Sequence, residues 1–213
     1  MNKITSKVFV IDDDEEILFA YSLLIKSAGY NVECFDGINQ LLERENYNGA
    51  GCILLDVFLG GKTGIELQEE IESKFECLPI IFISGHGNIP MSVETIKKGA
   101  VNFLQKPIDE RDLLIAIEEA IYKSNTLLTK YAEVEKYKSL VNALTAREYE
   151  IFRYVITGIQ NKHIAVELGI AEHTVKNHRL NITEKLGVKS VAEMIYIAKI
   201  LNIKAAAVNH NTF

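Results

Sequence analysis

The fold is decided by the stretch VFVIDDD, residues 8–14. Its first four residues are apolar and mostly β-branched, which is typical of a buried strand in a parallel sheet. A second apolar run, Cys52–Leu55, also ends in an acid, Asp56. Open α/β folds bind ligands at the carboxyl edge of the sheet, so we expect Asp12, Asp13 and Asp56 to share one cleft.

Carboxylates that crowd one cleft need a hard cation or a raised pKa, because their charges repel. The pattern therefore indicates a Mg²⁺ site beside a carboxylate that accepts a phosphoryl group. The alternative is that acids after strands serve only as turn and helix-capping residues. These acids alone do not separate the two interpretations.

Strand and helix patterns alternate over roughly the first 120 residues. The strand-like runs are residues 8–11, 32–35, 52–55, 80–84 and 101–104. The helix-like runs are residues 15–28, 38–45, 64–74, 90–98 and 109–122. Five strands that alternate with five helices predict an α/β fold with a doubly wound, mainly parallel five-stranded sheet.

The composition suits a globular protein of 213 residues with one large or two small domains. No apolar stretch approaches the roughly 20 residues that span a membrane, and the first residues lack a signal-peptide core. Cys34, Cys52 and Cys77 have neither CxxC nor metal-site spacing. We therefore expect reduced core thiols in a cytoplasmic protein that does not contact a membrane.

The net charge of −6 conceals an asymmetry along the chain. Residues 1–130 hold 12 Lys and Arg against 21 Asp and Glu, whereas residues 131–213 hold 11 against 8. The first part is acidic and the second mildly basic, which suggests two domains with different partners. Only the basic part suits a polyanion such as nucleic acid.

The second part of the chain is wholly helical in pattern. Residues 124–142 predict a helix that either extends the preceding one or stands as a second helix; a polar, frayed linker is the alternative. Thr145 and Glu148 fit a capping box at the start of the next helix. Three further helices are expected at residues 162–168, 172–186 and about 190–202, followed by a mobile tail at 204–213. We thus expect domains at 1–123 and 142–213, joined by a helical linker at 124–141.

One set of residues resembles the receiver domain of two-component response regulators across residues 7–122. The set comprises Asp12-Asp13, Asp56, Ser84 and Lys106-Pro107, in that order. The resemblance implies that Asp56 accepts the phosphoryl group, while Ser84 and Lys106 contact it. It also implies a Mg²⁺ site formed by Asp12, Asp13, Asp56 and the backbone carbonyl of Phe58.

Three further positions follow from this resemblance. Phe103 lies where the family has an aromatic switch residue, although plain core packing explains it equally well. The Lys106-Pro107 bond is expected to be cis, as in the family. The chain has Leu59-Gly60 where the family usually has Met-Pro, which predicts a more mobile loop. His86 is expected to be a loop residue rather than a general base.

Residues 144–190 resemble the LuxR-type helix-turn-helix of the FixJ/NarL response regulators. The matching residues include Thr145, Arg147-Glu148, Asn161-Lys162, Leu168-Gly169, Thr174-Val175-Lys176, His178 and Lys185-Leu186-Gly187. The helix at 172–186 is expected to enter the major groove, with Val175, Ile182 and Leu186 facing the core. The expected DNA contacts are Lys162, Thr174, Lys176, Asn177, His178 and Arg179, with Lys185 as a weaker candidate. Family members often carry a basic residue in place of Leu180, so the base preference does not transfer.

Together the resemblances imply a phosphorylation-controlled transcription regulator that is not an enzyme. Its expected partners are a sensor histidine kinase, promoter DNA, a second copy of itself after phosphorylation, and RNA polymerase. Residues 90–98, 101–104 and 109–122 are the expected receiver dimer surface. Two alternatives are a phosphotransferase with an aspartate nucleophile and a regulator controlled by a protein partner instead of phosphorylation.

Overall fold

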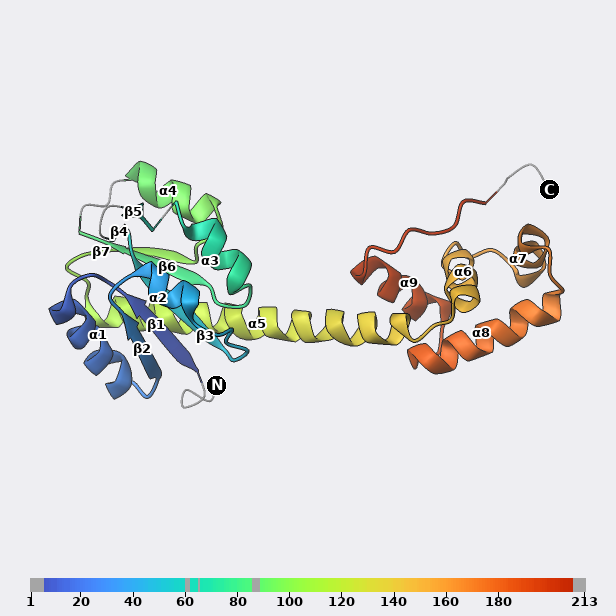
Figure 1. Cartoon of the computed structure of the whole chain (residues 1–213), viewed down its shortest axis with the longest axis horizontal. Coiled ribbons are helices and arrows are strands. Elements are labelled where there is room, and N and C mark those ends of the chain that lie inside the picture. The colour runs from blue at the N-terminus through green and yellow to red at the C-terminus, as the bar shows by residue number, and fades with distance from the viewer. Residues whose placement is uncertain (1–5, 60–61, 65, 86–88, 209–213) are drawn as a thin grey trace. The chain divides into compact units, whose positions relative to one another are not determined.

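The structure, a computed structural model, describes residues 6–59, 62–64, 66–85 and 89–208. Gly60 and His86, about which the sequence makes predictions, lie outside the described residues. The chain forms two compact units, Met1–Thr129 and Lys130–Phe213 (Figure 1). Each unit is described by itself.

The first unit is built on a parallel sheet of five strands in the order β2-β1-β3-β6-β7 (Figure 1). The strands are β1 (Lys7–Ile11), β2 (Asn31–Phe35), β3 (Gly51–Asp56), β6 (Ile80–Ser84) and β7 (Asn102–Gln105). The connecting helices are α1 (Glu15–Ser27), α2 (Ile38–Glu43), α3 (Gln68–Lys74) and α4 (Ile89–Lys97), with α5 (Glu110–Asn142) after the last strand. This order confirms the predicted doubly wound sheet.

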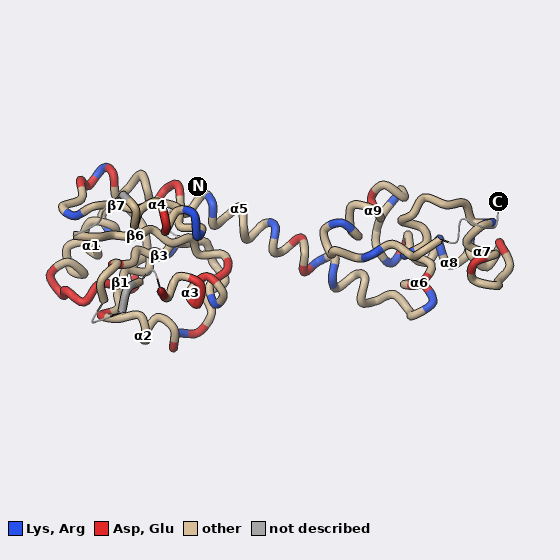
Figure 2. Tube along the Cα trace, turned by 90° about the horizontal axis from the view of Figure 1, so that it is seen from above, with Lys and Arg blue, Asp and Glu red and all other residues tan. Residues whose placement is uncertain are grey.

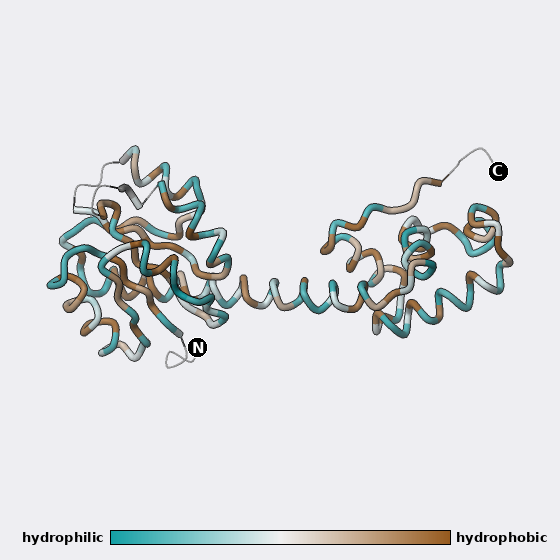
Figure 3. Tube along the Cα trace, in the orientation of Figure 1, coloured by the Kyte–Doolittle hydropathy of each residue, from teal (hydrophilic) through white to brown (hydrophobic). Residues whose placement is uncertain are grey.

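Two apolar clusters cover the two faces of the sheet, because alternate strand residues point in opposite directions. Phe9, Ile53 and Phe82 belong to the cluster that includes residues of α2 and α3. Val8 and Leu54 belong to the opposite cluster, which includes residues of α1 and α5. Helices on both faces explain why the three central strands, β1, β3 and β6, are almost wholly apolar and buried, as the apolar colouring of the sheet in Figure 3 shows. The edge strands β2 and β7 carry polar residues.

The start of α3 corrects the prediction of a helix from residue 64. In its place a short antiparallel pair, β4 (Phe58–Leu59) and β5 (Lys62–Thr63), follows β3. The Gly64 N–H donates to the Val57 carbonyl at 2.7 Å, which closes this hairpin onto the end of β3. A Cβ at Gly64 would lie 2.8 Å from the Asp56 carbonyl oxygen. Glycine is therefore required here by close backbone approach rather than as a helix start.

Helix α5 is continuous from Glu110 to Asn142, so the predicted helix at 124–142 extends the preceding one. The buried Ser124 fastens this helix to the first unit. Its hydroxyl donates to the Cys77 carbonyl at 2.6 Å and accepts the Gly51 N–H at 3.1 Å. The division between the two compact units falls later, after Thr129.

The second unit contains α6 (Ala146–Val155), α7 (Asn161–Leu168), α8 (Glu172–Leu186) and α9 (Val191–Ile200). Its core includes Ile151, Phe152, Ile164, Val175 and Ile182, together with Val141 near the end of α5. The predicted capping box is confirmed. The Thr145 hydroxyl accepts the Glu148 N–H, and the Glu148 carboxylate accepts the Thr145 N–H.

Two minor predictions were wrong in part. Only Cys52 of the three cysteines is fully buried, while Cys34 on β2 is exposed. The start of the predicted mobile tail is held against α6, because Arg153 donates to the Lys204 carbonyl at 2.9 Å and its own carbonyl accepts the Ala206 N–H at the same distance. Residues 209–213 lie outside the described residues.

Among the described residues, no helix combines the length and the apolar character required to cross a membrane.

Candidate functional site

Three acids meet at the carboxyl edge of the sheet, as the sequence predicts. Asp12 follows β1 and Asp56 ends β3, and these strands are paired in register at Ile11 and Leu55. Asp12 and Asp56 are 2% and 8% exposed, whereas Asp13 is exposed. One carboxylate oxygen from each acid lies within 4.8 Å of the others. The turn and capping interpretation is confirmed for the third acid of the run, since Asp14 accepts two backbone N–H groups at the start of α1.

Lys106 links two of the acids. Its Nζ lies 2.6 Å from an oxygen of Asp12 and 2.6 Å from an oxygen of Asp56. Burial works to lower the pKa of Lys106, but the hydrogen bonds and attraction to both carboxylates outweigh it and raise that pKa. Burial dominates at Asp12 and raises its pKa, although Lys106 and the Asp14 N–H act in the opposite direction. The site therefore holds an ammonium group where two buried carboxylates converge.

Backbone N–H groups hold the remaining oxygens in place. The Phe58 N–H donates to Oδ1 of Asp56 at 3.1 Å, and the Asp14 N–H donates to Oδ1 of Asp12 at 3.0 Å. The Phe58 side chain is 46% exposed, so its backbone rather than its ring serves the site. Asp56 is consequently oriented through both carboxylate oxygens.

Ser84 and Phe103 lie on the neighbouring strands. Ser84 ends β6, is fully buried, and its carbonyl accepts the Lys106 N–H at 2.8 Å. The Lys106-Pro107 peptide bond is cis, which confirms that prediction. Phe103 on β7 is partly buried and packs against the cluster that contains Phe82. Core packing is thus established for Phe103, and a switch role stays a prediction.

The second group of predicted site residues lies on α8 and α7. Val175, Ile182 and Leu186 are buried, as predicted. Lys162, Lys176 and Asn177 are exposed, while Thr174 and His178 are half-buried. The remaining two predicted contacts, Arg179 and Lys185, have partners inside the protein.

Arg179 and Lys185 are half-buried, and each is held by a partner inside the second unit. Arg179 donates to the Asn161 side chain on α7 at 2.7 Å. Lys185 lies 2.6 Å from the buried Glu148 carboxylate and also donates to the Ala143 carbonyl. The hydrogen bond from Lys185, followed by that from the Thr145 N–H, lowers the pKa of Glu148 to about 2. Lys185 therefore holds α8 against the start of α6.

Sequence reasoning missed this link between Glu148 and Lys185. The capping box identified Glu148 as a local helix-end residue, but a contact over 37 positions leaves no periodic signal. The only available sign was a basic residue in the last turn of α8, which the helix dipole alone already explains. The Phe58 N–H contact was missed for the same reason, because backbone donors are invisible in side-chain patterns.

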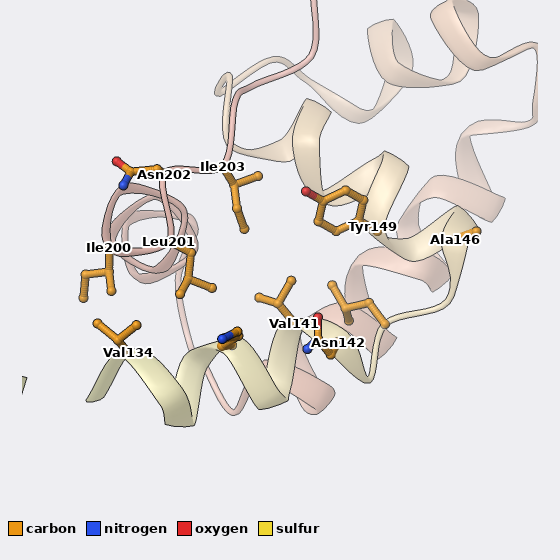
Figure 4. Close-up of a pocket in the computed structure, with 11 residues that line it drawn as sticks. Val134, Val141, Asn142, Ala146, Tyr149, Ile200, Leu201, Asn202 and Ile203 are labelled. Atoms are coloured by element: carbon orange, nitrogen blue, oxygen red, sulfur yellow. The ribbon is translucent and has the colours of Figure 1, made fainter. Parts of the chain in front are cut away.

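A hollow of about 660 Å³ lies elsewhere in the second unit (Figure 4). Its apolar lining comes from α5, the start of α6, the end of α9 and the segment after it, and includes Val134, Val141, Tyr149, Ile200 and Leu201. Its lining includes no residue of α7 or α8. The hollow is therefore separate from the predicted DNA contacts.

The two candidate sites lie in units of opposite net charge. Figure 2 shows acidic residues concentrated in the first unit, with Lys and Arg spread over the second. Residues 131–213 carry a net charge of +3. The acidic unit thus carries the cluster of Asp12, Asp13 and Asp56, and the basic unit carries α8.

The fold and these two sites define a phosphoacceptor domain joined to a helix-turn-helix domain. Comparison with known families supports each half: residues 8–118 match the response regulator receiver domain, and residues 142–198 match the bacterial regulatory proteins of the luxR family. The chain belongs to the two-component response regulators of the FixJ/NarL type.

Individual relatives extend the similarity over nearly the whole chain. Response regulator protein TodT of Pseudomonas putida F1 is 38% identical over 199 residues, 93% of this chain and 88% of TodT. Transcriptional regulatory protein FixJ of Bradyrhizobium diazoefficiens is 33% identical over 191 residues, 90% of this chain and 93% of FixJ. These relatives place the protein among DNA-binding transcription regulators of two-component systems, a family that is not one of enzymes.

Solved structures agree with this assignment. The response regulator StyR has a TM-score of 0.77 and 40% identity, and the match covers 92% of this chain and 98% of StyR. Full-length FixJ from B. japonicum has a TM-score of 0.53 and 31% identity, with 92% and 97% covered.

Proposed function

We propose that a sensor histidine kinase phosphorylates Asp56 and that the phosphorylated protein dimerises and binds promoter DNA. The observation that carries the proposal is the placement of Lys106 Nζ at 2.6 Å from both Asp12 and Asp56. An ammonium at this position neutralises charge that develops on a phosphoryl group during transfer. Two buried carboxylates with no such task would be costly to retain.

Each side chain at the sheet edge has a distinct task in this proposal. An oxygen of Asp56 forms a bond to phosphorus while the bond from phosphorus to the kinase histidine breaks. Lys106 binds the new phosphoryl oxygens as a point charge, and the Ser84 hydroxyl donates to one of them. Phe103 moves with Ser84 as the switch residue.

The acid cluster fits a Mg²⁺ ion. Its donors are carboxylate oxygens that lie within 4.8 Å of one another, from Asp12, Asp13 and Asp56. Mg²⁺ prefers one or two carboxylates with water and phosphate oxygens, and the Phe58 carbonyl would supply a further ligand. When bound, the ion neutralises charge on the phosphoryl group. Because Asp13 is exposed, an ion held there would be accessible to a phosphodonor.

Helix α8 is the proposed reader of the major groove. Lys176 and Asn177 are exposed and carry the groups that recognise guanine and adenine edges. Thr174, His178 and Lys162 suit phosphate oxygens. Arg179 reaches DNA only after it exchanges its Asn161 partner for a base or a phosphate.

Dimerisation would double these contacts and match a palindromic site. Exposed apolar side chains on the expected receiver surface support pairing there: Val93 and Ile96 on α4, and Ile115 and Tyr122 on α5. On α9, Met194 and Ala198 are buried in the core while Ile195 is 44% exposed. Only part of that helix is therefore available for a contact between the DNA-binding domains of two copies.

The proposed domain limits are 1–123 and 142–213, with a linker at 124–141. A cytoplasmic location and a contact with RNA polymerase follow from the regulatory role. The capture of a protein partner in place of phosphorylation is the competing regulatory scheme.

The test is DNA affinity on genomic fragments at fixed salt, with and without Mg²⁺ and beryllofluoride, which mimics the phosphoryl group. We expect tighter binding and a larger species by light scattering for the wild type, and neither in Asp56→Asn. Asp36→Asn is the matched control, because this exposed acid also follows a strand end but lies outside the cluster. Equal binding with and without beryllofluoride would instead favour control by a protein partner.

A further inference from the structure

Leu180 is an exception among the aliphatic residues of α8. Val175 and Ile182 are fully buried and Leu186 is 2% exposed, but Leu180 is 59% exposed. It does not belong to the core cluster of the second unit. A single exposed leucine is common on protein surfaces, so the position of this one within the helix decides its meaning.

Leu180 lies on the face of α8 that points away from the core. At roughly 100° per residue, Leu180 is about 140° around the axis from the buried Val175, with Lys176 at about 100° and Asn177 at about 200°. It therefore lies between these two side chains when viewed along the axis. The same face carries the exposed polar residues His173, Asn181 and Glu184.

Arg179, the residue before Leu180, faces a different side of α8. Arg179 is only about 40° from Val175 by the same count, and it is bonded to Asn161 on α7. Unlike Arg179, Leu180 has no side-chain hydrogen bond to give up when α8 binds DNA. It is the one aliphatic group on an outward face that is otherwise polar along the whole described helix.

The chemistry of base edges identifies what this side chain meets. An isobutyl group neither donates nor accepts hydrogen bonds, so it discriminates against the polar edges of guanine, cytosine and adenine. The one apolar group in the major groove is the 5-methyl of thymine. We infer that Leu180 contacts a thymine methyl group and makes a T·A pair a determinant of the operator.

The position of this pair follows from helix geometry. Leu180 is one turn, about 6 Å, beyond Lys176 along the axis. With about 3.4 Å between successive bases of a strand, the thymine falls about one to two base pairs from the base that Lys176 or Asn177 reads. This inference rests on the proposed role of α8 in the major groove.

The test begins with selection from a randomised duplex pool by the full-length protein in Mg²⁺ and beryllofluoride. We expect the wild-type sites to contain an invariant thymine in each half, next to the positions that change when Lys176 is replaced by Ala. Selection with Leu180→Ala should lose this thymine and keep the other positions. Val166→Ala on α7 is the matched control, because Val166 is 60% exposed and lies outside α8.

Replacement of that thymine by deoxyuridine then removes only the methyl group. For the wild type and Val166→Ala we expect affinity to fall about four-fold per substituted half-site, as for the loss of one buried methyl group. Leu180→Ala should bind both duplexes equally. The inference about Leu180, but not the proposed DNA-reading function, would be overturned by equal wild-type affinity for both duplexes. It would also be overturned if the sites selected by Leu180→Ala kept the thymine. Failure of the wild type to enrich any sequence would overturn the proposed DNA-reading function as well.

Discussion

At the scale of single residues, one oxygen of the Glu148 carboxylate, Oε2, serves two contacts at once. It caps the start of α6 and it accepts Lys185 from the end of α8. A buried carboxylate needs both, because burial without a cation would raise its pKa. One side chain thereby holds two helices of the DNA-binding unit together.

Replacement of Glu148 by Gln should destabilise the second unit by about 1–2 kcal/mol near neutral pH, because the charged partner of Lys185 is lost. The folded pKa of Glu148 is about 2 against an ordinary value of 4.5. Its contribution is therefore complete above pH 4.5 and is lost as the pH falls from there towards 2.

Urea unfolding followed by circular dichroism at about pH 7 and about pH 3 checks this linkage. The difference in free energy between wild type and Glu148→Gln should narrow at the lower pH. Glu150→Gln is the control, since Glu150 is exposed and its partner is an arginine only three residues away on the same helix. A difference that stays constant with pH would contradict the assigned role.

Gly64 permits the β4–β5 hairpin to approach the backbone of Asp56, the proposed phosphoryl acceptor. Gly64→Ala should cost about 1–3 kcal/mol, because the new Cβ must displace the backbone of Asp56. The same shift should slow phosphorylation of Asp56 by a small-molecule donor, measured as incorporation of labelled phosphoryl. Gly37→Ala serves as the control, because a Cβ there meets no atom within 4 Å. Identical behaviour of the two variants would refute the argument from close approach.

At the scale of elements, local patterns predicted most of the fold. Strand ends and Gly-punctuated helices were predicted to within a few residues because alternation and 3.6-residue periodicity are local signals. The β4–β5 pair was missed, since two-residue strands are too short to show alternation. The acid cluster was predicted because strand ends meet at one sheet edge, whereas the roles of Arg179 and Lys185 depend on partners distant in sequence.

Ser124 is an element-scale contact, because its hydroxyl joins α5 to the start of β3 at Gly51 and to the loop before β6 at Cys77. Ser124→Ala should cost about 1–3 kcal/mol, since it leaves the buried Gly51 N–H without an acceptor. Faster hydrogen exchange at Gly51 would report this loss directly. Thr126→Ala is the control on the same helix, because its hydroxyl only bonds back to the exposed Tyr122 carbonyl. Equal stability of both variants would show that water replaces the serine.

At the scale of the whole molecule, the negative charge lies mainly in the first unit and the second unit is mildly basic. The acidic unit carries the cluster of Asp12, Asp13 and Asp56 and the basic unit carries α8, so the net charge of each unit suits its proposed ligand. The consequence is a DNA affinity that depends on few cations, so each of them carries a large share of the salt dependence.

Lys176→Ala should therefore weaken binding and reduce the slope of log affinity against log salt by about one per subunit. The measurement is a salt titration of the beryllofluoride form on a selected operator. Lys204→Ala changes the formal charge equally at an exposed residue after α9 and should leave the slope unchanged. A slope that falls equally in both variants would mean that net charge, rather than position on α8, sets the affinity.

The anchor at Ser124 has a mechanical consequence for β3. All six residues of this strand are buried, with Asp56 at one end and Gly51, held by Ser124, at the other. The two ends lie about 16 Å apart along an extended backbone that hardly stretches. A displacement of Asp56 is therefore carried along a single strand to the contact with Ser124, near the middle of α5, without crossing a loop. Asp56 and the contact that anchors α5 thus lie at opposite ends of the same strand, β3.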